Sequence, residues 1–247
     1  MLEVRHISKA FAGLAVLDDL SLCVRDREIV ALTGPSGCGK TTLLNLISGI
    51  GSPDMGEIIG ADKKISYMFQ NTRLLPWRTV YDNIRLVNER AGHDAVMDLI
   101  RAVGLAGFEE YYPGQISGGM AKRCALARAF HYEGELLLMD EPFQGLDYGL
   151  RMEMLEMTLR IWKARKPSIL FVTHEIDEAL TVASRVAVLT DRPSRIRKEI
   201  ELPGANGRDC SDPALSGIRQ EIHRLVSGGS GVQQEMPVKH LNPVAFH

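Results

Sequence analysis

The stretch that most restricts the fold of this chain is GPSGCGKTT, residues 34–42. It fits the pattern G-x-x-x-x-G-K-[ST], in which glycines let backbone N–H groups wrap phosphate oxygens. In this pattern Lys40 reaches the β- and γ-phosphates, and the hydroxyl of Thr41 is a ligand of Mg²⁺. Such a loop needs a buried strand before it and a helix after it. Both flanks agree, because EIVALTG (28–34) is strand-like and LLNLISGI (43–50) has apolar residues at helical spacing.

Two further apolar runs resemble the strand that precedes this phosphate loop (residues 34–42). They are ELLLMDEP (135–142) and SILFVTHE (168–175), and helix-like sequence separates them. Near-continuous apolar strands that alternate with helices are typical of a parallel sheet covered on both faces. The sequence therefore predicts an α/β fold, with its working residues beyond the carboxyl ends of the strands.

Polar residues close both of these strands. Asp140 and Glu141 follow four consecutive apolar residues, and beside a phosphate loop we interpret Asp140 as holding Mg²⁺ through water. Glu141 would then orient and polarise the attacking water. His174 ends the other strand and is predicted to contact the γ-phosphate and that water. The competing interpretations are a solvated acidic turn and a hydrogen-bonded structural histidine.

Between about residues 71 and 130 the strand signals fade and helix-like stretches dominate. In HDAVMDLIRAVGL the side chains of Val96, Leu99, Ile100 and Val103 fall on one helical face. At the end of this region, ISGGMAKRCALARAF (116–130) predicts a helix that Ser117 caps. Glycines before a helix N-terminus create an anion site, although glycines in such a place often only let the chain turn.

Composition excludes several other classes of protein. A net charge of −2 gives no reason to expect nucleic acid as a partner, and the four cysteines have neither CxxC spacing nor a neighbouring histidine cluster. No zinc site or disulfide framework is expected. The longest apolar runs are strand-sized, far below the roughly 20 residues that cross a bilayer, so this chain is not expected to span a membrane.

Taken together, the motifs resemble the nucleotide-binding subunit of ATP-binding cassette (ABC) transporters. The matching pieces, in the family's order, are GPSGCGKTT, MFQN with Gln70, ISGGMAKRCALARA, LLLMDEP, GLD with Asp147, and VTHE. The resemblance covers about residues 1–203. It implies a P-loop NTPase (ABC ATPase) core with a parallel sheet flanked by helices, an N-terminal antiparallel β part and a helical subdomain inserted at about 71–130.

The resemblance also implies domain limits. An ABC ATPase domain is expected over 1–205, and a C-terminal helix with a loose tail over 206–247. In that helix, DPALSGIRQEIHRLV, Asp212 is the predicted N-cap and Pro213 the first helical residue. Leu215, Ile218, Ile222 and Leu225 form its apolar stripe.

The expected cofactors are ATP and Mg²⁺, and the expected reaction is ATP hydrolysis coupled to transport across a membrane. The resemblance places Phe11 against the adenine, with Val16 beside it; a plain core aromatic is the alternative for Phe11. The ATP-binding set is Phe11, Val16, Gly34, Pro35, Ser36, Gly37, Cys38, Gly39, Lys40, Thr41 and Thr42. The Mg²⁺ set is Thr41, Gln70 and Asp140, and the catalytic set is Glu141, His174 and Gln70.

The family packs two subunits head to tail, which implies an ATP-bound homodimer. Ser117, Gly118 and Gly119 would then touch the γ-phosphate held by the other subunit, and Asp147 would be a dimer contact. This chain departs from the family's pattern in two places. Met120 stands where glutamine is usual, with Ala121-Lys122 behind it, and Gln144-Gly145 stand where small residues are usual.

An apolar cluster follows Gln70 in a predicted loop. Leu74, Leu75, Pro76, Trp77 and Val80 are expected to lie exposed there, and exposed apolar clusters mark partner sites. The resemblance implies that Leu74, Leu75 and Trp77 dock separate transmembrane permease subunits, which in turn receive a substrate-binding protein. The chain would be peripheral, on the cytoplasmic side of the cell (inner) membrane. Burial of the cluster within the helical insertion is the alternative.

The segments LLPWRTVYDN and LTDRPSRIRKEIEL resemble the subgroup of importers for nitrate, sulfonates, taurine or thiamine-precursor pyrimidines. Three other functions compete with solute import. They are a soluble ABC ATPase of DNA repair, chromosome maintenance or translation, an exporter ATPase, and a nucleotide-binding module without turnover.

Overall fold

The structure, a computed structural model, describes residues 1–228 of the chain. Its main sheet has the strand order β5-β6-β7-β3-β8-β9. The bounds are β5 Ile65–Met68, β6 Leu136–Asp140, β7 Ser168–Val172, β3 Ile29–Thr33, β8 Arg185–Leu189 and β9 Ile196–Glu201. The first five strands in this order are parallel, and β9 pairs antiparallel with β8. The predicted parallel sheet is confirmed, with an antiparallel edge strand that the sequence analysis missed.

Every residue of β3, β6, β7 and β8 is buried. Their side chains divide between two hydrophobic cores because alternate residues of a strand point to opposite faces. On one face Val30 and Leu32 pack with α1 (Lys40–Ile47) and the N-terminal strands. On the other, Ile29 and Ala31 join the core of the helices α4 (Gly118–His131), α5 (Tyr148–Arg165) and α6 (Ile176–Val182).

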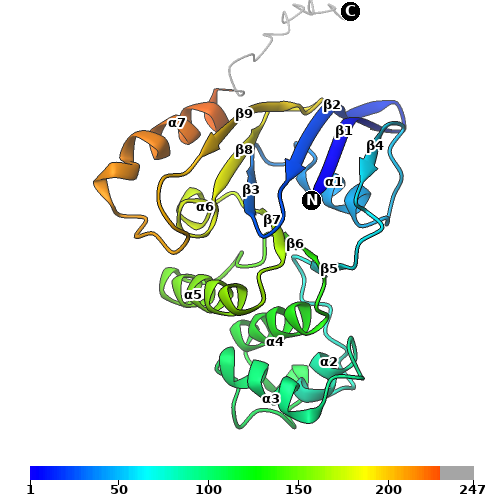
Figure 1. Cartoon of the computed structure of the whole chain (residues 1–247), viewed down its shortest axis with the longest axis vertical. Coiled ribbons are helices and arrows are strands. Elements are labelled where there is room, and N and C mark those ends of the chain that lie inside the picture. Colours follow the sequence, from blue (N-terminus) through cyan, green and yellow to red (C-terminus); the bar gives the residue numbers. More distant parts are fainter. Residues whose placement is uncertain (229–247) are drawn as a thin grey trace, which may run out of the picture.

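A smaller antiparallel sheet, in the order β2-β1-β4, lies over the α1 side (Figure 1). Its strands are β1 Leu2–Phe11, β2 Leu14–Val24 and β4 Met55–Ile59. A two-residue turn joins β1 to β2 and sets Phe11 opposite Leu14. The expected N-terminal antiparallel part is present, and its first hairpin points two apolar side chains in one direction.

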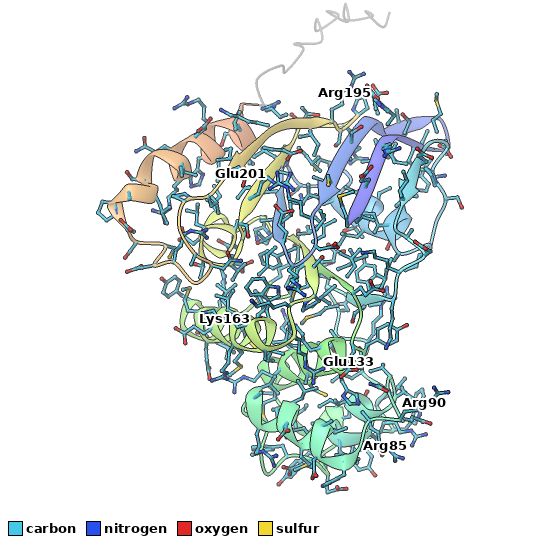
Figure 2. All side chains as sticks on the ribbon, viewed as in Figure 1. Arg85, Arg90, Glu133, Lys163, Arg195 and Glu201 are labelled. Carbon is cyan, nitrogen blue, oxygen red and sulfur yellow. The ribbon has the colours of Figure 1, made fainter. Side chains whose placement is uncertain are left out.

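The helices α2 (Val80–Arg85), α3 (His93–Ala102) and α4 (Gly118–His131) gather at one end of the molecule (Figure 1). A single 3₁₀ turn, Pro113–Gln115, leads into α4. The predicted apolar face of α3 is buried as expected, although Val103 lies just past the helix as its C-cap. Figure 2 shows Arg85 and Arg90 at the outer edge of this helical end, far from Arg195.

After β9 the chain makes a 3₁₀ turn, Pro213–Leu215, and then α7 (Ser216–Ser227). Asp212 caps the 3₁₀ turn rather than the α-helix, because its carboxylate accepts a hydrogen bond from the backbone N–H of Ala214. Leu215 and Ile222 are buried against α6 and β8 as the apolar stripe predicted. The tail expected to be loose lies outside the described residues from 229 on. Within residues 1–228, no helix combines the length and apolarity needed to cross a bilayer.

A buried ion cluster ties the amino ends of β3 and β8 together, opposite the phosphate loop. The Arg185 side chain is 5% exposed and lies 3.1 Å from the carboxylate of Glu28, which is 7% exposed. Its guanidinium also donates to the carbonyl of Cys23 at 2.6 Å and to Glu199. Burial lowers the pKa of Arg185, and the carboxylates of Glu28 and Glu199 outweigh that effect and raise it.

We predict that Arg185→Met lowers the free energy of unfolding by about 3–5 kcal/mol, because it leaves the buried Glu28 carboxylate with only the exposed Arg25 as a cation, 3.7 Å away. Arg195→Met is the matched control, since the Arg195 side chain is 57% exposed and its pair with Asp18 is a surface pair. Denaturant unfolding of both variants measures the difference. Equal, small losses for both would contradict a structural role for the cluster.

Candidate functional site

A cleft of about 600 Å³ lies beyond the carboxyl ends of the parallel strands. It collects side chains from segments far apart in the sequence: the first hairpin, the phosphate loop, and the residues that follow β5, β6, β7 and β8. Its lining is Phe11, Leu14, Val16, Ser36, Gly37, Gly39, Lys40, Thr41, Thr42, Gln70, Glu141, Gln144, His174 and Arg192. Most residues of the predicted ATP and catalytic sets therefore line one cleft. Gly34, Pro35, Cys38 and Asp140 lie beneath or beside this surface and do not line it.

The phosphate loop needs glycine at Gly39 for two reasons. Its φ of 114° is in the region that L side chains rarely adopt, and a Cβ there would lie 2.8 Å from Cγ1 of Val16. Directly after it, α1 begins at Lys40 and turns its free N–H groups and positive dipole end toward the cleft. The Lys40 ammonium donates to the carbonyls of Gly34 and Pro35, both at 2.9 Å, and so lies folded along the loop.

The last residue of β6, Asp140, is 5% exposed. Burial raises the pKa of its carboxyl group, while a hydrogen bond from the Thr41 hydroxyl opposes that rise. A buried carboxylate beside this hydroxyl fits Mg²⁺, which prefers oxygen ligands and keeps several waters. In the described part of the chain no group of three His, Cys, Asp or Glu side chains is arranged to hold a metal ion by itself, so a cation beside Asp140 would take phosphate oxygens and water as further ligands.

Glu141 and His174 come together at the ends of neighbouring strands β6 and β7. Oε2 of Glu141 lies 3.3 Å from Nδ1 of His174. The Glu141 backbone has a φ of 43°, in the left-handed region, and its N–H donates to the carbonyl of Val172 at 3.0 Å. Such a conformation is costly for a non-glycine residue and is characteristic of functional sites. It directs a carboxylate that is only 18% exposed into the cleft.

The aromatic side chain of Phe11 is 53% exposed at the end of β1. The alternative that it is a core aromatic is therefore wrong. Leu14, 55% exposed, lies opposite Phe11 in the hairpin, and Val16 completes an apolar wall of the cleft. Stacking of Phe11 on adenine stays a prediction, and this exposed, apolar wall is the environment it requires.

The stretch Ser117–Gly119 does not line this cleft, even though it belongs to the same chain. Ser117 is the N-cap of α4 as predicted, since its Oγ accepts a hydrogen bond from the N–H of Met120 at 3.2 Å. A Cβ added to Gly118 would meet no atom within 4 Å, whereas one on Gly119 would lie 2.7 Å from Cδ2 of Leu150. Asp147 caps α5 close by, accepting from the N–H of Leu150 at 3.0 Å.

The apolar cluster after Gln70 is partly exposed. Trp77 is 69% exposed, Leu74 and Leu75 are half-buried, and Leu74 packs against the core of the helical end. Val80 is 0% exposed, so its expected place in the exposed cluster is wrong. It is the first residue of α2, and its side chain faces the helices α3 and α4 instead.

The segment 74–79, called the docking loop below, has a fixed conformation. The buried amide of Asn83 accepts from the N–H of Leu75 at 2.8 Å and donates to the carbonyls of Leu75, Arg78 and Thr79. From α4, Arg128 donates to the carbonyls of Thr72 and Arg73 just before the loop. Trp77 is therefore presented to solvent by a braced backbone.

Three residues of these regions were missed by the sequence analysis: Leu14, Asn83 and Arg192. Leu14 was detectable, because a two-residue turn after Phe11 makes it the cross-strand neighbour. Asn83 and Arg192 gave no such signal. The Arg192 guanidinium lies 2.9 Å from where a Cβ of Gly37 would be, and only the pairing of β8 beside β3 brings them together.

Comparisons with known proteins agree with this geometry. Residues 17–144 match the ABC transporter family. An aliphatic sulfonates import ATP-binding protein of Pseudomonas savastanoi pv. phaseolicola is 39% identical over 90% of this chain and 94% of its own. One of the same description from Bacillus cereus is 35% identical over 94% and 96% of the two chains. An ABC transporter ATP-binding protein of Methanocaldococcus jannaschii is 39% identical over 91% of each.

Among solved structures, a dimeric post-hydrolysis state of an ATP-binding cassette bound to ADP and Pi has a TM-score of 0.74 to this chain. It is 25% identical, and the match covers 83% of this chain and all of that one. A dimeric bacterial ABC transporter cassette has a TM-score of 0.73 at 24% identity, which shows the shared fold.

Glu178 of α6 is 3% exposed, and the titration of its buried carboxyl group makes the stability of the chain depend on pH. Its carboxyl group accepts from Thr173 Oγ1 at 2.6 Å, and Arg151 lies 3.6 Å away. Burial raises the pKa of Glu178 from 4.5 to about 7. Because the folded chain holds this proton more tightly than the unfolded chain, the free energy of unfolding falls as pH rises from about 4.5 to about 7.

Glu178→Gln removes this titration. Relative to the unmodified chain, the variant should gain about 2–3 kcal/mol of stability between pH 5 and pH 8. Urea unfolding at both pH values measures the change, with Glu156→Gln, an exposed carboxylate of α5, as control. A difference between Glu178→Gln and the unmodified chain that stays constant from pH 5 to pH 8 would show that this carboxyl group does not titrate in the window.

Proposed function

Since this chain belongs to the ABC transporter family, as one of its ATP-binding and ATP-hydrolysing subunits, we propose that it energises a solute importer through separate membrane permease subunits. The observation that carries the proposal is the division of phosphate-binding elements within the chain. Lys40, Glu141 and His174 line one cleft, while Ser117 and its glycines begin a capped helix that does not line it. The two parts of the proposed composite site therefore do not meet within one chain.

In the cleft, ATP would stack its adenine on Phe11 and place its phosphates on the N–H groups of the phosphate loop and α1. Among the described residues, the partners of the Lys40 ammonium all belong to its own loop: the carbonyls of Gly34 and Pro35 and, weakly, Sγ of Cys38. No carboxylate holds the ammonium there, so it can turn to the β- and γ-phosphates. Mg²⁺ would be held by Thr41, Gln70 and Asp140. When bound, it neutralises charge on the β- and γ-phosphate oxygens.

Glu141 is placed to orient the attacking water and accept its proton as the water oxygen bonds to the γ-phosphorus. The bond to the leaving ADP oxygen then breaks, which releases inorganic phosphate. His174, 3.3 Å from Glu141, is placed to contact the γ-phosphate and the same water. The left-handed backbone of Glu141 fixes the carboxylate before substrate arrives.

A second copy of the chain would complete the site. Ser117 and the free N–H groups of Gly118 and Gly119 form an anion site at the start of a 14-residue helix. In the head-to-tail homodimer they would bind the γ-phosphate held by the partner, and Asp147, capping α5 next to them, would lie at the interface. Dimeric cassettes of the same fold support this arrangement.

The docking loop supports permease subunits as partners. Its braced backbone presents Trp77, and next to it the N–H of Val80 donates to the carbonyl of Tyr111 at 2.8 Å. Tyr111 and Tyr112 are 43% and 45% exposed. Exposed aromatic groups gathered on a fixed backbone are typical of interaction sites. The chain would then lie peripherally on the cytoplasmic side of the membrane.

Aliphatic sulfonates are the cargo that the relatives favour, because relatives that match at least 90% of this chain carry that description. Nitrate, taurine and similar small solutes are the alternative cargoes that we propose. A substrate-binding protein would select the solute outside the membrane.

We predict that Gly118→Asp prevents ATP-driven dimerisation and lowers ATP hydrolysis at least about 100-fold, because its carboxylate opposes the partner's γ-phosphate. ATP affinity of the monomer should change less than twofold. Sedimentation of the hydrolysis-blocked Glu141→Gln chain with ATP, with and without the second substitution, measures dimerisation directly.

Gly118 suits this test because a side chain there meets no atom of its own subunit within 4 Å, unlike Gly119. Gly217→Asp is the control, since Gly217 lies on α7 in equally open space. An equal loss of ATP affinity and hydrolysis in Gly118→Asp would mean that the glycine serves its own subunit, and the composite site would be wrong.

For import, we predict that Trp77→Ala weakens assembly with the permease subunits and lowers ATP-driven uptake of a small alkanesulfonate into vesicles at least about tenfold. Hydrolysis by the isolated subunit should persist, since the side chain of Trp77 takes no part in the chemistry. Co-purification, uptake and basal hydrolysis are measured on one preparation.

Met55→Ala is the matched control, because Met55 is 68% exposed but lies on β4, away from the helical end. Loss of basal hydrolysis or of folding in Trp77→Ala would show that the tryptophan is structural. Normal uptake by Trp77→Ala would remove the docking loop from the interface.

A further inference from the structure

The two places where this chain departs from the ABC pattern meet in space. Lys122 follows the substituted Met120 on α4, and Gln144 stands in the turn after β6. The ammonium of Lys122 donates to the backbone carbonyl of Gln144. The side chain of Gln144 in turn accepts from Nε2 of Gln70 at 2.5 Å. Glycine or alanine at position 144 would offer Gln70 no side-chain acceptor.

Gln144 also belongs to the turn that carries Glu141, because its backbone N–H donates to the carbonyl of Glu141 at 3.2 Å. Gln70 and Gln144 both line the cleft beside Glu141 and His174. The bond between the two glutamines therefore links the segment after β5 to the segment after β6, at the place where the γ-phosphate and its water are expected.

On this basis we propose that Gln144 is a positioning residue for ATP hydrolysis, acting through Gln70 and anchored by Lys122. An amide has one carbonyl oxygen and one NH₂ group, and only the oxygen is a ligand of Mg²⁺ or an acceptor for water. When Nε2 of Gln70 donates to Gln144, its Oε1 is left for the reacting centre. The inference rests on the proposed function of this cleft.

Lys122 of α4 supports Gln144 through the hydrogen bond to its backbone carbonyl. Burial lowers the pKa of its ammonium, so a hydrogen-bond partner for that group matters more than at the surface. By holding the carbonyl of Gln144, it fixes the backbone from which the Gln144 side chain extends. The Ser117 end of α4 and the Gln70 side chain are thus connected within one subunit.

The test replaces Gln144 by methionine, which keeps the length of the side chain and removes the acceptor. We expect kcat for ATP hydrolysis to fall about three- to tenfold, the effect of losing one exposed hydrogen bond. KM for ATP should change less than twofold and the urea midpoint should not move, because Gln144 is exposed. Gln220→Met on α7, an exposed glutamine outside the cleft, is the control.

A double substitution tests whether Gln144 affects ATP hydrolysis through Gln70 or independently of it. In a Gln70→Met background, Gln144→Met should cause no further fall in kcat, since it acts only through Gln70. Lys122→Met should lower kcat in the unmodified chain and have no effect in a Gln144→Met background.

Three outcomes overturn the inference. The first two are an unchanged kcat in Gln144→Met and an unchanged kcat in Gln70→Met. The third is a fall in kcat of the double variant that equals the product of the two single falls. Failure of the proposed import function looks different, because uptake into vesicles would then be absent while the unmodified chain still hydrolyses ATP and Gln144→Met still lowers kcat.

Discussion

The junction between β3 and α1 determines where the other residues of the cleft must lie. At this junction the buried strand β3 ends and α1 begins with its first N–H groups free. Between them, Gly39 has a positive φ and lies so close to Val16 that a side chain would not fit. Parallel pairing then brings the ends of β6 and β7 beside this loop. Asp140 ends β6 beside the cleft, and Glu141 and His174, within two residues of the ends of β6 and β7, line it, so the order of strands in the sheet brings these side chains together.

Much of this arrangement was accessible from the sequence because its signals are local. The strands β3, β6 and β7 are buried on both faces and therefore apolar throughout, and Ser117 caps its helix with its own side chain. What was missed depends on contacts between distant segments. The antiparallel pairing of β9 has no local signature, because IRKEIE alternates weakly and only Ile200 of it is buried. Val80 was misplaced because its burial is decided by α3 and α4, not by its apolar neighbours in sequence.

The chain has two segments that we expect to bind anions, and they do not line the same cleft. One is the phosphate loop in the cleft, and the other is the start of α4 with Ser117 and Gly118. The contrast between the two glycines of this second site is informative. A Cβ on Gly119 would meet the side chain of Leu150 in its own subunit, whereas one on Gly118 would meet nothing within 4 Å among the described residues. A glycine that its own subunit does not require is the feature expected where a second molecule approaches.

In the proposed ATP-bound homodimer, the start of α4 in one chain lies against the phosphate loop of the other chain. Ser36 is exposed in that loop and Ser117 caps α4, so a chain with Ser36→Cys mixed with a chain with Ser117→Cys tests it directly. A disulfide requires Cα atoms within about 7 Å. In a Glu141→Gln background, mild oxidation should give a disulfide between the two chains only when ATP is present, above the background of the native cysteines in the unmodified chain. ATP binding without any such disulfide between chains would contradict the claim.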